Sequence, residues 1–289
     1  MALVFEHVSY TYTPLTKRQI KEGQEPLWAL NDISFEIADG EFLAIAGHTG
    51  SGKSTLVLHL NGVINPTRGK VLWNGQELSD KKTANEARGD IGVVFQYPEN
   101  QLFAATVYED VAFGPRNLGL DATEVEQRVK DAIELVELDY ETFKDRSPFE
   151  LSGGQQRRVA FAGVLAMRPT TLVLDEPVAG LDPASRNEFL GFIDRLHKRG
   201  ITLVMVSHNM NDIARLADRV LVLNRGEIAF LGTPEEVFSH PVELRQIGLG
   251  VPHAQRMANE LRELGVPLEE GLYSPETLAE HLVALLESR

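Results

Sequence analysis

The run from Gly47 to Ser54 matches the phosphate-binding pattern G-x-x-x-x-G-K-[ST]. It lies between an apolar run, 42–46, and a helix-competent run, 54–60, which is the strand, loop and helix context that the pattern requires. Glycines let the loop turn tightly, so that backbone N–H groups and the start of the helix point at a phosphate. Lys53 adds a positive charge, and Ser54 adds a hydroxyl that can bind Mg²⁺. The residues expected to hold the phosphates are Gly47, His48, Thr49, Gly50, Ser51, Gly52, Lys53, Ser54 and Thr55.

A second motif with phosphate-binding chemistry occupies residues 151–155, where the sequence reads Leu-Ser-Gly-Gly-Gln. A hydroxyl, two flexible glycines and the start of a predicted helix form another anion site. The candidates for this second contact are Ser152, Gly153, Gly154 and Gln155.

Polar side chains end three apolar runs that we predict to be strands. Asp175 and Glu176 follow the run 172–174, and we expect Asp175 to hold Mg²⁺, directly or through water, while Glu176 polarises an attacking water. His208, after the run 202–206, can reach a γ-phosphate and orient that water. Gln96, after the run 91–95, can offer its amide to the metal or the water. A single histidine or glutamine at a strand end is more often structural, so the prediction depends on the combination.

Composition limits the classes of protein that fit. Hydrophobic residues make up 43% of the 289 residues and charged residues 24%, which is ordinary for a globular protein. The 42 acidic and 28 basic residues give a formal net charge of -14, which disfavours direct binding of nucleic acid or anionic lipid. The absence of cysteine excludes disulfides and thiolate metal sites. No apolar run approaches the roughly 18 residues of a membrane-spanning helix, and residues 1–7 lack a signal-peptide pattern. We therefore expect a cytoplasmic protein that reaches a membrane through a protein partner.

Apolar runs that alternate with helical patterns predict an α/β fold. Near-continuous apolar strands between helices are typical of a parallel sheet that is covered on both faces. Between these runs the pattern becomes helical, with a predicted capping box of Thr106 and Glu109 and an amphipathic repeat over 124–138. We therefore predict a helical subdomain, 98–167, inserted into a core formed by 1–97 and 168–239.

Two segments stand apart from this core. Residues 13–27 lack periodicity and are predicted to form a surface loop. Residues 240–289 are predicted to form a helical extension, in which Ser274 and Pro275 begin a helix with Leu278, Leu282, Leu285 and Leu286 on one face. That face packs on its own domain or on a second subunit, and the sequence leaves both open.

The order of these motifs over residues 3–239 resembles the ATP-binding-cassette (ABC) ATPases. The resemblance implies an α/β P-loop NTPase core with an inserted helical subdomain and an N-terminal antiparallel β subdomain, and it implies ATP and Mg²⁺ as cofactors. It also implies that Tyr12, rather than Tyr10, stacks on adenine and that Ser152 and Gly154 contact the γ-phosphate held by the opposite subunit. Asp182 would lie in a loop at the dimer interface.

Within the ABC ATPases, the runs 95–103, 110–117, 147–150 and 157–166 are similar to the energy-coupling-factor (ECF) transporter ATPases, and more to the second of their two paralogous subunits. This similarity implies a peripheral protein on the cytoplasmic face of the cell membrane. It would pair with its paralogue or with itself, dock on a transmembrane coupling subunit, and drive uptake of a vitamin or a transition-metal ion through a separate substrate-binding membrane subunit. From the acidic net charge, we expect no nucleic-acid partner.

The segment after Gln96 is the predicted docking surface for the membrane partner, because a γ-phosphate sensed at Gln96 could shift it. The expected contacts are Tyr97, Glu99, Leu102 and Phe103, with Glu99 as the counter-charge for a basic residue of the partner. An ordinary connecting loop with a buried Phe103 is the alternative interpretation.

The sequence as a whole predicts ATP hydrolysis at a dimer interface, with Glu176 as general base and His208 supporting the transition state. Two other classes share many of these residues. A soluble ABC ATPase of cofactor assembly or DNA repair would have every catalytic motif, although the acidic charge disfavours DNA. A binding module that does not hydrolyse ATP fits less well, because Glu176 and His208 are both present.

Overall fold

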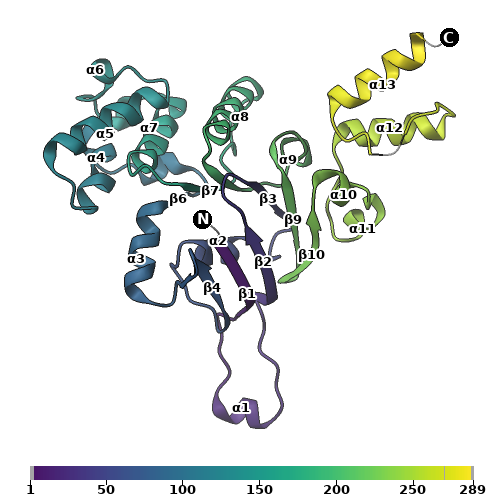
Figure 1. Ribbon diagram of the computed structural model, residues 1–289, viewed down its shortest axis with the longest axis horizontal. Helices are drawn as coiled ribbons and strands as arrows, with labels where there is room; N and C mark the ends of the chain where they lie inside the picture. The colour runs from purple at the N-terminus through teal and green to yellow at the C-terminus, as the bar shows by residue number, and fades with distance from the viewer. Residues whose placement is uncertain (1–2, 270, 288–289) are drawn as a thin grey trace.

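Two β-sheets form the centre of the molecule in the computed structural model, which describes residues 3–269 and 271–287 (Figure 1). The smaller sheet is antiparallel and has the strand order β2-β1-β4-β5. Its strands are β1 (Leu3–Tyr10), β2 (Leu30–Ile37), β4 (Arg68–Trp73) and β5 (Gln76–Glu77).

The larger sheet has the strand order β10-β9-β3-β8-β7-β6, and all its neighbouring strands are parallel except the pair β9 and β10. Its strands are β3 (Phe42–Gly47), β6 (Ile91–Val94), β7 (Thr171–Asp175), β8 (Thr202–Val206), β9 (Arg219–Asn224) and β10 (Glu227–Gly232). Every residue of β3 and β8 is buried, as expected for parallel strands that are covered on both faces.

Side chains that alternate along the central strands divide between two cores. On one face, Leu43 and Ile45 of β3 pack with helix α2 (Lys53–Leu60) and with the smaller sheet. On the other face, Phe42 of β3 packs toward the inserted helices and α8 (Pro183–Lys198). Ala44 and Ala46, also on that second face, pack instead with α9 (Met210–Leu216) and the helices that follow β10.

The inserted helices lie together at one side of the larger sheet, at the left of Figure 1. They are α4 (Val107–Asn117), α5 (Ala122–Leu135), α6 (Tyr140–Phe143) and α7 (Gly153–Leu165), with the short 3-10 helices η1 (Pro98–Gln101) and η2 (Pro148–Glu150). Thr106 caps α4 by accepting a hydrogen bond from the Glu109 amide, as predicted. The reciprocal half of the predicted capping box was wrong, because Arg116 holds the Glu109 carboxylate instead.

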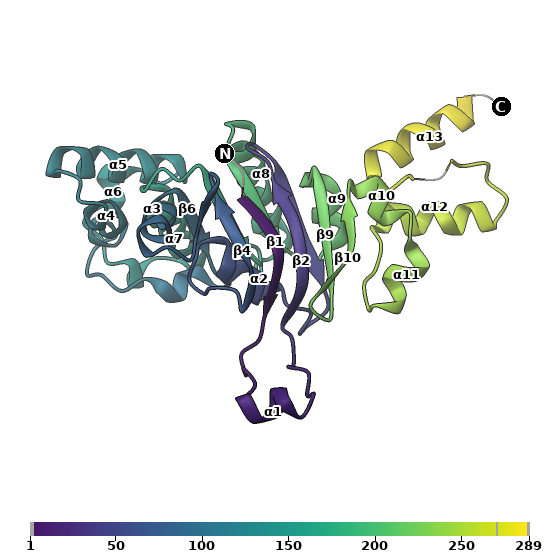
Figure 2. The ribbon, with the colours of Figure 1, turned by 60° about the horizontal axis from the view of Figure 1, so that its bottom comes forward.

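The segment between β1 and β2 projects from the molecule at the bottom of Figure 1 and in Figure 2. It was predicted as a surface loop, and it contains the short helix α1 (Lys17–Lys21). The sequence also gave no prediction of α3 (Lys81–Asp90), whose ten residues are mostly polar, or of β10.

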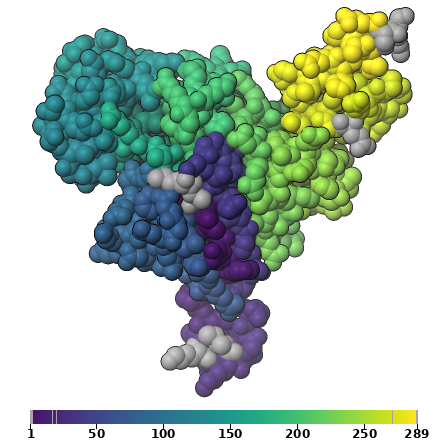
Figure 3. Space-filling model, viewed as in Figure 1, coloured from purple at the N-terminus to yellow at the C-terminus, as the bar shows by residue number. Residues whose placement is uncertain are grey.

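Helices α10 (Pro234–Phe238), α11 (Pro241–Gln246), α12 (His253–Glu263) and α13 (Pro275–Glu287) follow the larger sheet. The last two form a lobe with its own small apolar cluster, at the upper right of Figure 3. Leu278 is buried in that cluster and Leu282 and Leu285 pack against it, whereas Leu286 is exposed. Three of the four predicted leucines therefore pack within their own chain, and packing of the face on a second subunit stays a prediction. Within the described residues, no helix is both long and apolar enough to cross a membrane.

Candidate functional site

The order of the parallel strands brings the predicted catalytic segments to one edge of the larger sheet. β3, β8, β7 and β6 are consecutive neighbours, so their carboxyl ends lie side by side. The phosphate loop follows β3, His208 follows β8, Glu176 follows β7 and Gln96 follows β6. The crevice beyond the carboxyl ends of parallel strands is where α/β proteins bind their ligands.

The phosphate loop is a tight turn between β3 and α2. Gly52 has φ 108°, and a Cβ at this position would lie 2.6 Å from the Ala29 carbonyl oxygen, so glycine is required there. The Lys53 ammonium folds back over the loop and donates to the carbonyl oxygens of Gly47 at 2.6 Å and His48 at 3.0 Å. Burial lowers the pKa of Lys53, and the nearby charges of Glu176 and Asp175 partly offset this effect.

A cavity of about 350 Å³ lies against this loop. Tyr12 forms one wall of it, with 61% of its surface exposed, and the Tyr12 hydroxyl is 3.1 Å from the Thr55 Oγ1. Tyr10 packs edge-on against both Tyr12 and His59, so its ring already has partners inside the fold. Tyr12 thus lines this cavity and Tyr10 does not, and the stacking of adenine on Tyr12 stays a prediction. The cavity is lined by Tyr12, Ala29, Thr49, Gly50, Gly52, Lys53, Ser54 and Thr55.

Two carboxylates lie at the end of β7. Burial, reinforced by the charge of Glu176, raises the pKa of Asp175, and the charge of Lys53 opposes the rise. Glu176 has φ 51°, and its backbone N–H donates to the Val206 carbonyl at 3.0 Å, which fixes the carboxylate at the sheet edge. Lys53, Asp175 and Glu176 therefore form one electrostatic cluster.

His208 contacts Glu176 directly, with 2.8 Å between its Nδ1 and the Glu176 Oε1. Because a carboxylate accepts hydrogen bonds, this contact assigns the proton to Nδ1. Gln96, Glu176 and His208 line the same cavity of about 290 Å³, together with Tyr97 and Arg186. The structure thus brings together three of the residues that were predicted from separate strand ends.

The donor set near the phosphate loop suits Mg²⁺. Ser54, Gln96 and Asp175 offer a hydroxyl, an amide and a carboxylate, which are hard oxygen ligands. In the part of the chain that the structure describes, no group of three or more His, Cys, Asp or Glu side chains is placed to hold a metal ion. One carboxylate with a hydroxyl and an amide fits Mg²⁺, which typically binds through one or two carboxylates plus substrate phosphates.

The second phosphate motif begins helix α7 on the inserted helices. Ser152 is the N-cap, and it exchanges hydrogen bonds with Gln155 in a capping box. Ser152, Gly153 and Gly154 are exposed, and Cβ atoms built on the two glycines meet nothing within 4 Å. These residues line neither of the two cavities described above. The motif therefore faces outward, where a second molecule can reach it.

Asp182 begins helix α8, and most of its hydrogen-bonding capacity is used there. Its carboxylate accepts from the backbone of Ala184 and Ser185 and from the Ser185 hydroxyl. The Ser185 hydroxyl and the two amides lower the pKa of Asp182. Its predicted place in a dimer interface stays a prediction.

The predicted docking segment, Tyr97–Phe103, differs from the expectation at two of its four residues. The Glu99 carboxylate is paired inside the molecule with Arg157, at 3.0 Å from Nε and 2.8 Å from Nη2. Glu99 as a free counter-charge for a partner was therefore wrong. Leu102 is 8% exposed and belongs to the main apolar core, so only a small part of its side chain reaches the surface. Tyr97 and Phe103 are exposed.

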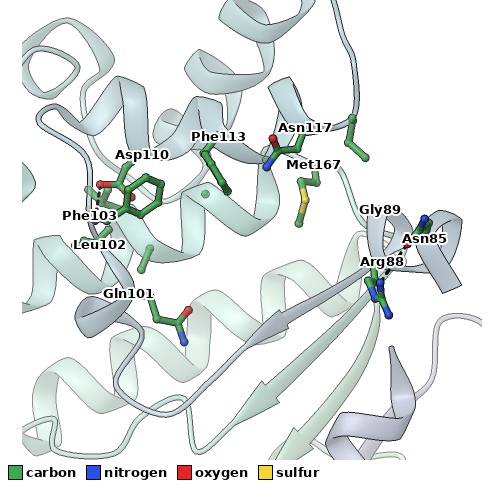
Figure 4. A pocket seen from close by; sticks show the side chains of 15 residues that line it. Asn85, Arg88, Gly89, Gln101, Leu102, Phe103, Asp110, Phe113, Asn117 and Met167 are labelled. Atoms are coloured by element: carbon green, nitrogen blue, oxygen red, sulfur yellow. Dashed lines mark hydrogen bonds between the residues drawn. The ribbon is translucent and has the colours of Figure 1, made fainter. Parts of the chain in front are cut away.

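A groove of about 660 Å³ begins at Leu102 and Phe103 and runs between the inserted helices and α3 (Figure 4). Phe103 and Phe113 pack edge to face with their ring centroids 5.0 Å apart, and Asn85 and Arg88 of α3 lie at the opposite end. Phe113 was missed by sequence reasoning. A signal was available, because Phe113 is an aromatic residue outside the buried positions of the amphipathic helix α4.

Comparisons with known proteins show the family to which the chain is similar. Residues 30–179 match the sequence model of the family described as "ABC transporter". The chain is 56% identical over 266 residues to the energy-coupling factor transporter ATP-binding protein EcfA2 of Symbiobacterium thermophilum, covering 92% of this chain and 90% of that protein. It is 48% identical to the protein of the same name from Clostridium perfringens, over 99% of this chain and 98% of that protein.

Solved structures share the fold. CbiO1 from Clostridium perfringens, described as part of the ABC transporter complex cbiONQ, has a TM-score of 0.73 and 35% identity over 90% of this chain and 98% of that chain. The ATP-binding cassette MJ0796, solved as a dimer in a post-hydrolysis state with ADP and Pi, has a TM-score of 0.68 and 30% identity over 80% of this chain and 98% of that chain. These likenesses confirm the predicted fold class. The chain belongs to the ABC transporter family and, within it, to the energy-coupling factor transporter ATP-binding proteins.

Proposed function

We propose that this chain is the ATP-hydrolysing subunit of an ECF-type importer and that hydrolysis occurs where two ATPase subunits meet. The main support for the proposal is the hydrogen bond between Glu176 and His208. It lies at the edge of the sheet where the phosphate loop and Gln96 also lie. A base, its orienting partner and a phosphate cradle are the parts that phosphoryl transfer to water requires.

ATP binds along the loop cavity. Adenine stacks on Tyr12, and the phosphates meet the backbone N–H groups of Gly47–Thr55 and the Lys53 ammonium. The hydrogen bonds that Lys53 makes to Gly47 and His48 hold its charge over the loop. Mg²⁺ would be held by Ser54, Gln96 and Asp175, and when bound it neutralises charge on the phosphate oxygens.

Glu176 is the general base, and it takes a proton from the water that attacks the γ-phosphate. The His208 Nδ1–H donates to Glu176, which orients the ring and leaves Nε2 free to face the γ-phosphate or the water. Gln96 shares the cavity and positions the same water through its amide.

The exposed signature at Ser152–Gln155 completes the nucleotide site of a second subunit. Two observations support this step. The signature residues do not line either of the two cavities described above, and the space around Gly153 and Gly154 is open. The second subunit is the paralogous ATPase or another copy of this chain. Asp182, at the start of α8, lies in the loop that would face that subunit.

The groove beside Phe103 and Phe113 receives a helix of the transmembrane coupling subunit, and with that partner this chain works at the cytoplasmic face of the membrane. The support is the exposed aromatic pair at one end of the groove. An exposed apolar hollow bordered by polar side chains is typical of a protein interaction site. Uptake of a vitamin or a metal ion then follows through a separate substrate-binding subunit. A soluble ABC ATPase without transport is not favoured, because the relatives named above are transporter subunits over nearly the whole chain.

Replacement of Glu176 by Gln tests the proposal. We expect the purified transporter to bind ATP as the wild type does. We expect its rate of ATP hydrolysis to fall by about 100-fold or more, the typical contribution of a positioned base. Glu141→Gln is the matched control, because Glu141 forms only an exposed pair with Lys144 on α6. ATP hydrolysis by Glu176→Gln within a few-fold of the Glu141→Gln rate would exclude Glu176 as the base.

A further inference from the structure

A buried guanidinium joins three segments around the site. Arg157 lies on α7, five residues after the N-cap Ser152 of the signature, and it is 3% exposed. It makes two hydrogen bonds to the Glu99 carboxylate in η1, the segment that follows Gln96. It makes two more to backbone carbonyls, of Pro177 at 3.3 Å and Ala179 at 3.0 Å, in the turn that follows Glu176.

Besides Arg157, the turn at 176–181 is held by its own backbone and by Val178 and Leu181, which pack against the main apolar core. Its internal hydrogen bonds run from the Ala179 amide to the Glu176 carbonyl and from the Leu181 amide to the Val178 carbonyl. Glu176 has φ 51°, a backbone conformation that residues other than glycine rarely adopt, so the surrounding contacts must hold it there. The residues that bracket this turn are Glu176, the proposed base, and Asp182, the first residue before α8.

Glu99 prepares the guanidinium for this role. Burial acts to raise the pKa of Glu99, but the hydrogen bonds and charge of Arg157 outweigh it and hold that pKa below its ordinary value, so the pair is charged. A bidentate pair fixes the plane of the guanidinium and aims its remaining N–H groups at fixed points. Those points are the two carbonyl oxygens of the turn.

We propose that Arg157 is a positioning residue for hydrolysis, which holds the turn after Glu176 in its working geometry only while η1 and α7 are docked beside it. The inference depends on the proposed role of Glu176. A shift of the docking segment or of the signature helix would move Arg157 and, through the two carbonyls, the base. Binding of the membrane partner and of the second subunit would in this way control the rate of chemistry rather than the binding of ATP.

Three variants in the purified transporter test this, with kcat, KM and equilibrium ATP affinity as readouts. Arg157→Lys keeps the charge but cannot reach Glu99 and both carbonyls at once. We expect its kcat to fall about 10-fold or more, as a displaced catalytic group does, with ATP affinity within twofold of wild type. Glu99→Gln keeps the hydrogen bonds from Arg157 to the two carbonyls but removes the charged pair that orients the guanidinium. We therefore expect a smaller loss of kcat than in Arg157→Lys.

Arg158→Lys is the matched control. Arg158 is the next residue of α7 and bonds to Glu137, Glu188 and the Val136 carbonyl, with no contact to the turn. We expect its kcat to stay within twofold of wild type. A kcat of Arg157→Lys within that range, or equal losses of kcat and ATP affinity, would overturn the proposal. So would a Glu99→Gln loss as large as that of Arg157→Lys, since the ion pair alone would then account for the effect.

If Arg157→Lys does not assemble, hydrogen exchange decides the question in Glu99→Gln. We expect faster exchange in the peptide 176–182 and unchanged exchange in β7, and equal exchange in both proteins would overturn the proposal. Glu176→Gln measured alongside separates the two claims. If it hydrolyses ATP normally, the proposed function fails. If it is inactive while Arg157→Lys is unaffected, only the positioning role fails.

Discussion

Phe103 and Leu102 are neighbours in sequence, but replacing each by alanine should have different consequences. Leu102→Ala should cost more folding stability, and Phe103→Ala should cost more affinity for the membrane partner. Phe103 is 60% exposed, and its main contact is the edge-to-face pair with Phe113. Such a pair contributes about 0.5–1.5 kcal/mol, so Phe103→Ala should lower the free energy of unfolding by about 1 kcal/mol. Leu102 is 8% exposed and lies in the main core, where a leucine-to-alanine change costs about 2–5 kcal/mol.

For affinity to the membrane partner, Phe103→Ala should have the larger effect. If the groove receives a membrane partner's helix, Phe103 is one of its central aromatic contacts, and loss of such a residue costs about 2 kcal/mol or more, roughly a 30-fold loss of affinity. Urea unfolding of the isolated subunit gives the first quantity, and titration of the subunit against the solubilised coupling subunit gives the second.

Phe149→Ala is the control for docking, because Phe149 is also an exposed phenylalanine, at 61%, but does not line the groove. We expect it to bind the coupling subunit as the wild type does. The reasoning is refuted if Phe103→Ala and Phe149→Ala bind equally well, or if Phe103→Ala unfolds as readily as Leu102→Ala.

Two further predictions concern the charged cluster. Lys53→Ala should weaken ATP binding about 10-fold or more, because it removes a charged donor to the phosphates, whereas Glu176→Gln should not; unchanged ATP affinity in equilibrium titration would contradict the loop as the binding site. Asp175→Asn should raise the free energy of unfolding by about 1 kcal/mol at neutral pH, measured without nucleotide or metal as a higher melting temperature. The same change should abolish ATP hydrolysis. The raised pKa of Asp175 means that wild-type stability falls as the pH rises from the unfolded-state value, 3.8, through the folded-state pKa. The gain in Asp175→Asn should therefore shrink as the pH is lowered through that range, and a gain that does not depend on pH would contradict this cause.

The sequence predicted the catalytic edge because each of its parts is a local pattern. An apolar strand followed by a polar residue identifies Glu176, His208 and Gln96 without knowledge of the fold, and the parallel sheet then places them together. Their catalytic roles stay predictions.

Contacts between distant segments could not be predicted in this way. Glu99 and Arg157 are separated by 58 positions, and only the packing of η1 on α7 shows that the carboxylate is already paired. The exposure of Phe103 and the burial of Leu102 follow from the short helix η1, which has no periodic pattern to read. The polar helix α3 was missed for the same reason, although it forms one end of the groove.

One apolar cluster runs without a break from Val129 of α5 through Phe161 of α7 to Phe192 of α8 and Leu203 of β8. The inserted helices therefore share their core with strands and helices that come later in the chain. The inserted helices pack on one another, but during synthesis they leave the ribosome before β7, α8 and β8 exist, so the apolar surface around Phe161 that packs on α8 must wait uncovered. A chain that stops before residue 171 would leave that surface exposed. Successful folding of this protein thus depends on prompt completion of its second half, and the inserted helices are where a chaperone would be needed first.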